Sequence, residues 1–202
     1  MNLPRGEYMT QEQLHRRFSN PPTLESDRLI LRKISVSDAE DMFAYSQRED
    51  VTRYLLWDPH PDVIYTEHYI RYLQGRYEVG DFYDFALVLR TTGKMIGTVG
   101  FTSFDLPNSG AEIGYVISPE YQGCGYATEA VKRILAYGFE ECGLVRISAI
   151  CMKGNLASLR VMEKCGMKRE GVLRSAVYAK GEMKDVHLSA IIDRDYFNKA
   201  CT

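Results

Sequence analysis

The chain has 202 residues, of which 45% are hydrophobic and 26% charged, the composition of an ordinary globular domain. Its 25 basic and 27 acidic residues leave a formal charge of −2, so electrostatics gives no reason to expect nucleic acid as a partner. No apolar run approaches the roughly 20 residues that cross a bilayer, so no membrane partner is expected.

Cysteine and histidine usage argues against disulfide and metal chemistry. The five cysteines are odd in number and lack paired C-x-x-C spacing, which is unlike a disulfide framework or a zinc site. His60 and His68 have no acidic or cysteine companions, so no metal is expected. The first 20 residues lack the apolar segment of a secretory signal. These features predict a reduced, cytoplasmic protein.

The first part of the chain predicts a short extension, a strand and two helices. Pro21 and Pro22 separate a charged segment, residues 1–22, from residues 23–202, which are expected to form one domain. Residues 27–33 (DRLILRK) have the pattern of a strand. Ser37 and Glu40 have capping-box spacing, so a helix should begin near Asp38. A second, amphipathic helix is expected over residues 61–78.

The rest of the chain alternates between strands and helices. Three strands are expected at 82–89, 94–104 and 111–118, then a helix at 125–142, a strand at 145–152, a helix at 155–166 and a hairpin at 172–192. This order predicts a mixed α/β sheet, antiparallel in its meander and parallel where a helix intervenes.

Residues 118–129, SPEYQGCGYATE, predict an anion site. The stretch joins a strand to a helix, and the first N–H groups of a helix carry partial positive charge without an internal partner. Gly123 and Gly125 would let a phosphate approach those groups. The stretch is not a P-loop, since no Gly-Lys-Ser/Thr follows, and Thr128 rules out G-x-G-x-x-G. A glycine-rich turn without a ligand is the alternative.

One further pattern fits this loop. Gln122, Gly125 and Ala127 match Gln/Arg-x-x-Gly-x-Gly/Ala, and here the chain resembles the GCN5-related N-acetyltransferase (GNAT) superfamily. The blocks DRLILRKISVSDAEDMF, DVTRYLLW, EIGYVISPEYQGCGYATEA and VRISAICMKGNLASLRVMEKCGM are similar to its RimJ/RimL-type branch, which acetylates the N-termini of ribosomal proteins. The resemblance extends from residue 24 to about residue 198. It implies the GNAT fold, an α/β (α+β) architecture whose mixed central sheet of about six to seven strands has a splayed strand pair and flanking helices.

The resemblance implies acetyl-CoA as co-substrate and indicates which residues bind it. Asn155 is placed near the pantetheine amides, although it also reads as a helix N-cap. A bulge at residues 116–118 is expected to splay the strands. The backbone groups expected to pair with pantetheine belong to Val116, Ile117 and Ser118. The loop expected to hold the pyrophosphate comprises Gln122, Gly123, Cys124, Gly125, Tyr126, Ala127 and Thr128.

The resemblance also suggests catalytic residues. Many GNAT enzymes protonate the departing thiolate with a tyrosine, but Met162 stands at that position. Ser158 matches the serine that serves the ribosomal-protein branch instead, and its alternative is a polar first-turn residue. Glu112 is the candidate general base, with a solvent-facing strand charge as the alternative. An acidic residue that is common in the branch is absent, because residues 175–177 read SAV.

The acceptor is expected to bind between the first two helices and the final hairpin. Trp57, Tyr54, Tyr83 and Tyr178 could line that site, and packing roles are their alternative. The implied function is direct acetyl transfer in a ternary complex to a primary amine, with a protein N-terminal α-amine as the favoured acceptor. A small amine (polyamine, amino acid or antibiotic) and a non-catalytic acyl-CoA sensor are the alternatives. Family members sometimes pair through sheet edges and hairpins, so a homodimer is left open.

Overall fold

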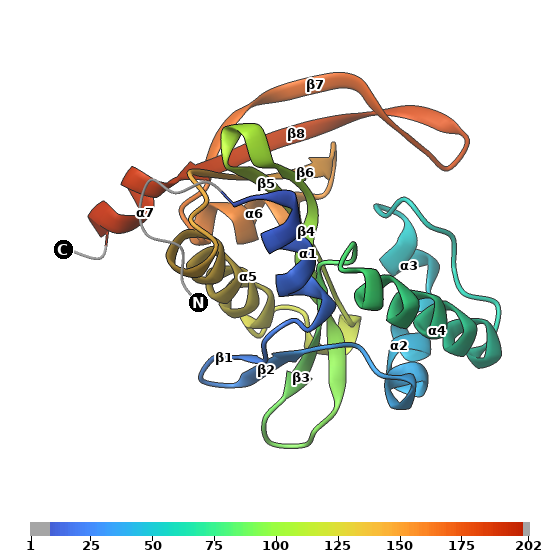
Figure 1. The fold of residues 1–202 in the computed structure, drawn as a ribbon. Helices are drawn as coiled ribbons and strands as arrows, with labels where there is room; N and C mark the ends of the chain where they lie inside the picture. Colours follow the sequence, from blue (N-terminus) through green and yellow to red (C-terminus); the bar gives the residue numbers. More distant parts are fainter. Residues whose placement is uncertain (1–8, 200–202) are drawn as a thin grey trace.

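The computed structural model describes residues 9–199 and is built around one mixed sheet (Figure 1). The sheet has eight strands in the order β1-β2-β3-β4-β5-β6-β8-β7. All neighbouring strands are antiparallel except β5 and β6. The strands are β1 (Leu24–Glu25), β2 (Leu29–Arg32), β3 (Asp84–Leu89), β4 (Met95–Asp105), β5 (Gly110–Ile117), β6 (Arg146–Met152), β7 (Lys168–Ala179) and β8 (Glu182–Ile192).

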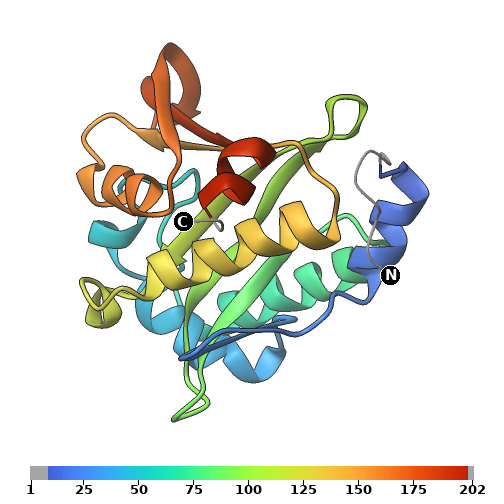
Figure 2. The same ribbon diagram turned by 90° about the vertical axis from the view of Figure 1, so that its left-hand side faces the viewer.

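Helices cover both faces of the sheet. The helix α5 crosses one face beside α6, and α2 and α4 lie on the other (Figures 1 and 2). A π-helical turn, Tyr137–Glu141, extends α5. The helices are α1 (Gln11–Ser19), α2 (Ala39–Ser46), α3 (Glu49–Thr52), α4 (Val63–Val79), α5 (Tyr126–Ala136), α6 (Leu156–Lys164) and α7 (Asp193–Lys199).

The parallel strands β5 and β6 pair only at their beginnings. Their register covers three positions, the last of which joins Glu112 to Ser148. Beyond that pair the two strands separate, so the expected splayed pair is present. The sheet has one strand more than the expected range because the two-residue β1 joins its edge. The expected bulge at residues 116–118 is wrong, since β5 pairs there regularly with β4, and the register shift lies at Phe101–Ser103 of β4.

Alternation along the strands gives the sheet two hydrophobic cores. In β3, Phe85 and Leu87 belong to the core beneath α5, whereas Ala86 and Val88 belong to the core beneath α2 and α4. All four side chains are buried. Full burial of a leucine or phenylalanine stabilises the fold by about 1.5–3 kcal/mol. The strand therefore fixes which residues can face each helix layer.

The helix α1 lies within the segment of residues 1–22 and packs against the rest of the domain. Phe18 is fully buried, and its ring contacts those of Tyr83 (4.8 Å between centroids), Phe104 (5.6 Å) and Phe101 (6.2 Å). Thr10 caps the helix by accepting a hydrogen bond from Gln13. The core beneath α5 thus includes a side chain that precedes Pro21.

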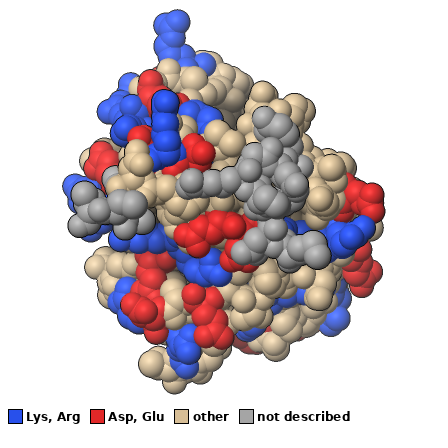
Figure 3. All heavy atoms as spheres, turned by 60° about the vertical axis from the view of Figure 1, so that its left-hand side comes forward, with Lys and Arg blue, Asp and Glu red and all other residues tan. Residues whose placement is uncertain are grey.

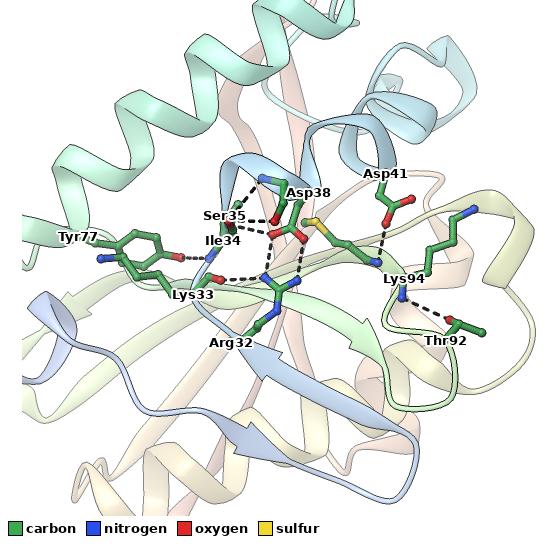
Figure 4. Close-up of polar contacts among 11 residues, drawn as sticks. Arg32, Lys33, Ile34, Ser35, Asp38, Asp41, Tyr77, Thr92 and Lys94 are labelled. Carbon is green, nitrogen blue, oxygen red and sulfur yellow. Dashed lines mark hydrogen bonds and ion pairs between the residues drawn. The ribbon is translucent and has the colours of Figure 1, made fainter.

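Polar contacts attach the layer that contains α2 and α4 to the sheet (Figure 4). The Arg32 guanidinium, at the end of β2, binds both carboxylate oxygens of Asp38, at 2.7 and 2.8 Å. Asp38 also accepts a hydrogen bond from the amide of Ser35 (2.8 Å). The capping box consequently joins Ser35 and Asp38, and the predicted pair of Ser37 and Glu40 does not form it. The predicted helix start is nearly correct, because α2 begins at Ala39.

On the face drawn in Figure 3, Lys and Arg are interspersed with Asp and Glu. Within residues 9–199, no helix is both long enough and apolar enough to span a bilayer.

Candidate active site

A large groove opens where β5 and β6 separate, between the end of β5 and the start of α6. Its volume is about 460 Å³, and we call it the cofactor groove. All residues that the resemblance implies for acetyl-CoA line it, except Ser118 and Cys124. Those lining residues are Val116, Ile117, Gln122, Gly123, Gly125, Tyr126, Ala127, Thr128, Asn155 and Ser158.

The glycine-rich loop presents backbone donors to this groove. Gly123 (φ +76°) and Gly125 (φ +84°) both adopt the left-handed conformation that favours glycine. Within residues 9–199, the amides of residues 123–125 donate to no backbone carbonyl. The next three amides open the 11-residue helix α5 and lack intrahelical partners. The loop is therefore suited to hold an anion. The Cys124 side chain is exposed to solvent and does not line the groove.

An ion-pair network that the sequence analysis missed fixes this loop to the edge of the sheet. The Glu129 carboxylate accepts hydrogen bonds from Ser26 Oγ (2.7 Å), the Arg28 amide (2.8 Å) and Arg28 Nε (2.6 Å). Arg28 also donates to the Cys124 carbonyl (3.0 Å), and its guanidinium lies 4.3 Å from the centre of the Tyr126 ring. Burial raises the pKa of Glu129, but the hydrogen bonds from Arg28 and Ser26 outweigh it and lower the pKa overall.

The end of β5 differs from expectation at Ser118. Its N–H donates to the Ile96 carbonyl (2.8 Å), and its carbonyl accepts from the Tyr121 amide (2.9 Å). Ser118 therefore has no free N–H for pantetheine. By strand alternation, the backbone groups of Ile117 face away from β4 and toward the groove. The Gln122 side chain donates to the Ile117 carbonyl (3.0 Å), so it orients this strand end.

The first turn of α6 places a hydroxyl in the groove. Asn155 caps the helix, because its side chain accepts a hydrogen bond from the Ser158 amide (3.2 Å). Ser158 Oγ lies 2.8 Å from the hydroxyl of Tyr115 on β5, and that hydroxyl also donates to the Ser158 carbonyl (3.0 Å). Met162 is buried in the core, so it cannot serve the groove. Two hydroxyls from opposite walls thus meet where β5 and β6 separate.

Tyr115 was not predicted as a site residue. Burial raises its pKa, and the hydrogen bond with Ser158 only partly opposes this effect. Its proton therefore remains in place at neutral pH. The signal in the sequence was its position, three residues before Ser118 on the strand expected to border the cofactor.

Glu112 is not among the residues that line the cofactor groove. It occupies the last position at which β5 and β6 pair, and Thr102 Oγ1 donates to its carboxylate (3.1 Å). Burial raises the pKa of Glu112, while the Thr102 hydrogen bond opposes the rise. As a base it would have to act through water.

The four residues predicted for the acceptor site are dispersed. Tyr54 lines the cofactor groove and donates to the Gly154 carbonyl (3.3 Å). The prediction for Tyr83 is wrong, because its ring packs against Phe18 in the core beneath α5. Tyr178 is exposed on the β7–β8 hairpin and lines neither cavity. Trp57 alone lines a second cavity.

This second cavity lies on the face of the sheet covered by α2 and α4, and has a volume of about 70 Å³. The tip of the β7–β8 hairpin reaches its rim, where Lys180 Nζ binds the Trp57 carbonyl (2.5 Å) and the Asp58 carboxylate (2.6 Å). Val116 lines both this cavity and the cofactor groove. The lining residues are Ile34, Met42, Tyr45, Ser46, Trp57, His60, Tyr69, Leu73, Phe82, Asp84, Thr98 and Val116.

Comparisons with known proteins agree with this geometry. Residues 28–168 match the family model described as an acetyltransferase (GNAT) domain. The uncharacterized N-acetyltransferase YoaA of Bacillus subtilis is 36% identical over 171 residues, which cover 85% of this chain and 97% of the relative. A GNAT-family acetyltransferase from Bacillus anthracis has a similar structure, with a TM-score of 0.76 and 31% identity over 86% of this chain and 99% of that one. The chain belongs to the GNAT acetyltransferase family and has its fold, a fold that binds acetyl-CoA.

More distant relatives carry names for two classes of acceptor. A ribosomal-protein-S5-alanine acetyltransferase from Vibrio fischeri is similar in structure, with a TM-score of 0.70 and 25% identity over 87% of this chain and 98% of that one. A spermidine N(1)-acetyltransferase from Vibrio cholerae is 23% identical over 87% of this chain and 99% of its own length.

Proposed function

We propose that this enzyme transfers the acetyl group of acetyl-CoA to the N-terminal α-amine of a protein or peptide, as the RimJ/RimL-type branch does. The observation that supports this function best is the cofactor groove, where the glycine-rich loop lies at one end and the Ser158 hydroxyl faces the splayed strands. The cytoplasmic location and a homodimer remain predictions from the sequence.

The residues of the groove would divide the binding of acetyl-CoA among them. The amides of the glycine-rich loop would hold the pyrophosphate. Arg160 and Lys164, which also line the groove, would attract the remaining phosphate charge. The Ile117 N–H would face the thioester carbonyl, where negative charge develops in the transition state.

The reaction forms one bond and breaks one. The lone pair of the neutral amine attacks the thioester carbon, the C–N bond forms, and the C–S bond breaks. The amine loses a proton, and the departing thiolate takes one up. Ser158 would donate a hydrogen bond to this thiolate, supported by Tyr115. A thiol with a pKa of about 8.5 leaves readily near neutral pH, so a hydrogen bond is sufficient.

An α-amine needs little help from a base, because an appreciable part of it is already neutral near pH 7. At pH 7, an α-amine of pKa ~7.8 is about 14% neutral, whereas an alkylamine of pKa ~10.4 is about 0.04% neutral. Glu112, acting through water, remains the proposed base from the sequence. Acetylation of a small amine is the second candidate, and the spermidine-acetylating relative supports it.

The test is thiol release from acetyl-CoA with a mixed panel of amines. The panel contains peptides with free Ala, Ser or Met N-termini, the same peptides blocked but carrying lysine, spermidine, and aminoglycosides. Turnover confined to free N-termini is the expected result. Turnover on spermidine alone would replace the α-amine with a small acceptor. Binding of acetyl-CoA without turnover on any amine would favour the sensor alternative.

A further inference from the structure

We propose that the second cavity binds the acceptor amine, and that the Asp84 carboxylate holds the protonated amine and takes up its proton before attack. The inference rests on the proposed function, assigns proton uptake to Asp84 in place of Glu112, and adds a ligand class. That class is a primary ammonium group at the end of a slender chain.

The charge of Asp84 is uncompensated in the protein. Among residues 9–199, no group donates a hydrogen bond to its carboxylate and no cation pairs with it. Burial raises its pKa to about 7. A buried charge without a partner is costly, and proteins normally pair it. A bound ammonium would supply the missing partner.

The groups around Asp84 are neutral near pH 7. They come from each element packed against it: Tyr45 on α2, His60 in the loop before α4, and Tyr69 and Tyr77 on α4. Burial raises the pKa of each tyrosine, to about 12 for Tyr69, and lowers that of His60. Among the described residues that line the cavity, Asp84 is the only Asp, Glu, Lys or Arg, while Asp38, Asp41 and Arg76 act on Tyr45 and Tyr69 from outside the lining.

The remaining walls also suit an ammonium group. The His60 ring lies 5.4 Å from that of Trp57 and 5.4 Å from that of Tyr69, measured between centroids, so aromatic surface lines one side. Aromatic faces attract cations, most strongly where water is excluded. Ser46 Oγ is buried in the same lining without a hydrogen-bond partner. An ammonium group has three N–H donors and could use both Asp84 and Ser46.

Two glycines, Gly100 and Gly114, leave the surface of the sheet without side chains between Asp84 and the strand β5. Gly100 on β4 pairs with Asp84 on one side and with Gly114 of β5 on the other. A Cβ on Gly100 would lie only 2.4 Å from Asp84 Oδ1, so the carboxylate occupies the space above this glycine. Val116, on the same face of β5, borders both cavities. An amine held by Asp84 would thus lie beside the wall that it shares with the cofactor groove.

Tyr77 is a positioning residue for this carboxylate. Its hydroxyl donates to the Asp84 carbonyl (2.5 Å) and accepts from the Ile34 amide (3.4 Å; Figure 4). These bonds join α4 to the start of β3 and to the segment after β2. The backbone at Asp84 is therefore fixed from two sides.

The proton balance is complete with the groups present. One N–H bond of the ammonium breaks as an O–H bond forms on Asp84, and the freed lone pair attacks the thioester carbon. A second amine proton neutralises the departing thiolate, and Asp84 returns its proton to solvent. An α-amine of pKa ~7.8 nearly matches a carboxyl of pKa about 7, whereas an alkylamine of pKa ~10.4 holds its proton far more strongly. Of the two amine classes, an α-amine therefore gives up its proton to Asp84 more easily.

The test compares Asp84→Asn, which keeps the shape and removes the charge, with Glu112→Gln and Asp105→Asn. Asp105 ends β4, and its carboxylate accepts hydrogen bonds from Asn108 Nδ2 (2.9 and 3.1 Å), so its variant is the control for a lost carboxylate. We expect kcat/KM for a free-N-terminus peptide to fall at least about 100-fold in Asp84→Asn, and the low-pH limb of its pH profile near pH 7 to disappear. Asp105→Asn should match the wild type. The thermal midpoint of Asp84→Asn should not fall, since a buried unpaired charge is removed.

A binding measurement separates this proposal from the proposed function. Trialanine and spermidine are titrated by calorimetry into the complexes of wild type and Asp84→Asn with CoA, which cannot transfer an acetyl group. Binding that requires Asp84 supports the cavity assignment, even if the wild type turns over no amine and the proposed function fails. Equal binding in both proteins, or none in either, overturns it. Loss of the low-pH limb in Glu112→Gln alone would also overturn the role in proton uptake.

Discussion

Ser158 and Tyr115 place two hydroxyls in contact where β5 and β6 separate, and the proposed mechanism uses them in place of a tyrosine acid. Met162 is buried and has no proton to donate, so this position of α6 offers no acid. The pair of hydroxyls instead joins α6 to β5 across the opening of the splayed strands. In the proposed mechanism, Tyr115 orients the serine, and the serine would face the departing sulfur.

Ser158→Ala should lower kcat about tenfold with little change in acetyl-CoA affinity, because the hydroxyl matters mainly as the thiolate forms. Tyr115→Phe keeps the ring but removes the bond that orients Ser158, so its kcat should fall less. The measurements are kcat from thiol release and Kd from calorimetry. Unchanged turnover in Ser158→Ala would leave this residue with a structural role only.

Gly125→Glu should abolish measurable acetyl-CoA binding, since a carboxylate would then face the pyrophosphate at the start of α5. The matched control is Gly93→Glu. Gly93 has a similar left-handed backbone (φ +72°) in the β3–β4 turn, with no atom near the position of an added Cβ. Calorimetry should show normal affinity for the control. Equal affinities in the two variants would contradict the assignment of the glycine-rich loop.

The predictions for Tyr83 and Ser118 differ from the structure for a common physical reason. Tyr83 and Asp84 are neighbours, yet they face opposite layers, because successive side chains at a strand alternate between its faces. The sequence analysis named Tyr83 for the acceptor site, whereas the proposal above names its neighbour Asp84, which lines the second cavity. The prediction that the Ser118 N–H pairs with pantetheine differs from the structure for a similar reason, since this N–H points toward β4 and away from the groove.

At the scale of elements, the glycine-rich loop depends on a strand far away in the sequence. Glu129, in the first turn of α5, joins the loop to Ser26 and Arg28 beside β2. Hydrophobic periodicity predicted the order of strands and helices, and turn residues predicted where they end. Neither signal contains the contact between residues 28 and 129, since it depends on which sheet edge α5 crosses.

Glu129→Gln should reduce the free energy of unfolding by about 1–2 kcal/mol at pH 7 and weaken acetyl-CoA binding severalfold. The pKa of Glu129 is lower in the folded state than its ordinary value of 4.5. Its contribution to the free energy of unfolding is therefore complete above pH 4.5, and it is lost as the pH falls through the pKa of the folded state. The difference between wild type and variant should therefore shrink in acid. Urea unfolding at pH 7 and pH 3.5 measures it. A comparable loss in Glu163→Gln, an exposed carboxylate on α6, would contradict this role.

At the scale of the whole molecule, the core beneath α5 continues into the segment that precedes Pro21. Phe18 belongs to an aromatic group that includes Phe85 of β3, Phe101 of β4 and Tyr137 after α5. The sequence analysis separated residues 1–22 on composition and proline content, and neither property reports burial of a single ring. The packing of α1 makes its removal costly.

Phe18→Ala should lower the free energy of unfolding by about 3–5 kcal/mol, the usual cost of removing a buried phenylalanine. Glu12→Ala is the control on the exposed face of α1, and should change stability by no more than ~0.5 kcal/mol. Chemical denaturation of the full chain provides both values. Similar stabilities for the two variants would show that α1 folds apart from the domain.

Val116 borders both the cofactor groove and the second cavity, so the proposed binding of acetyl-CoA in one and of the amine in the other would place both substrates against the same side chain. A ligand that displaces this side chain changes the shape of both sites. By thermodynamic linkage, the factor by which acetyl-CoA alters the affinity for the amine must equal the factor by which the amine alters the affinity for acetyl-CoA. With both ligands bound as proposed, Val116 would be the side chain through which the two affinities are coupled.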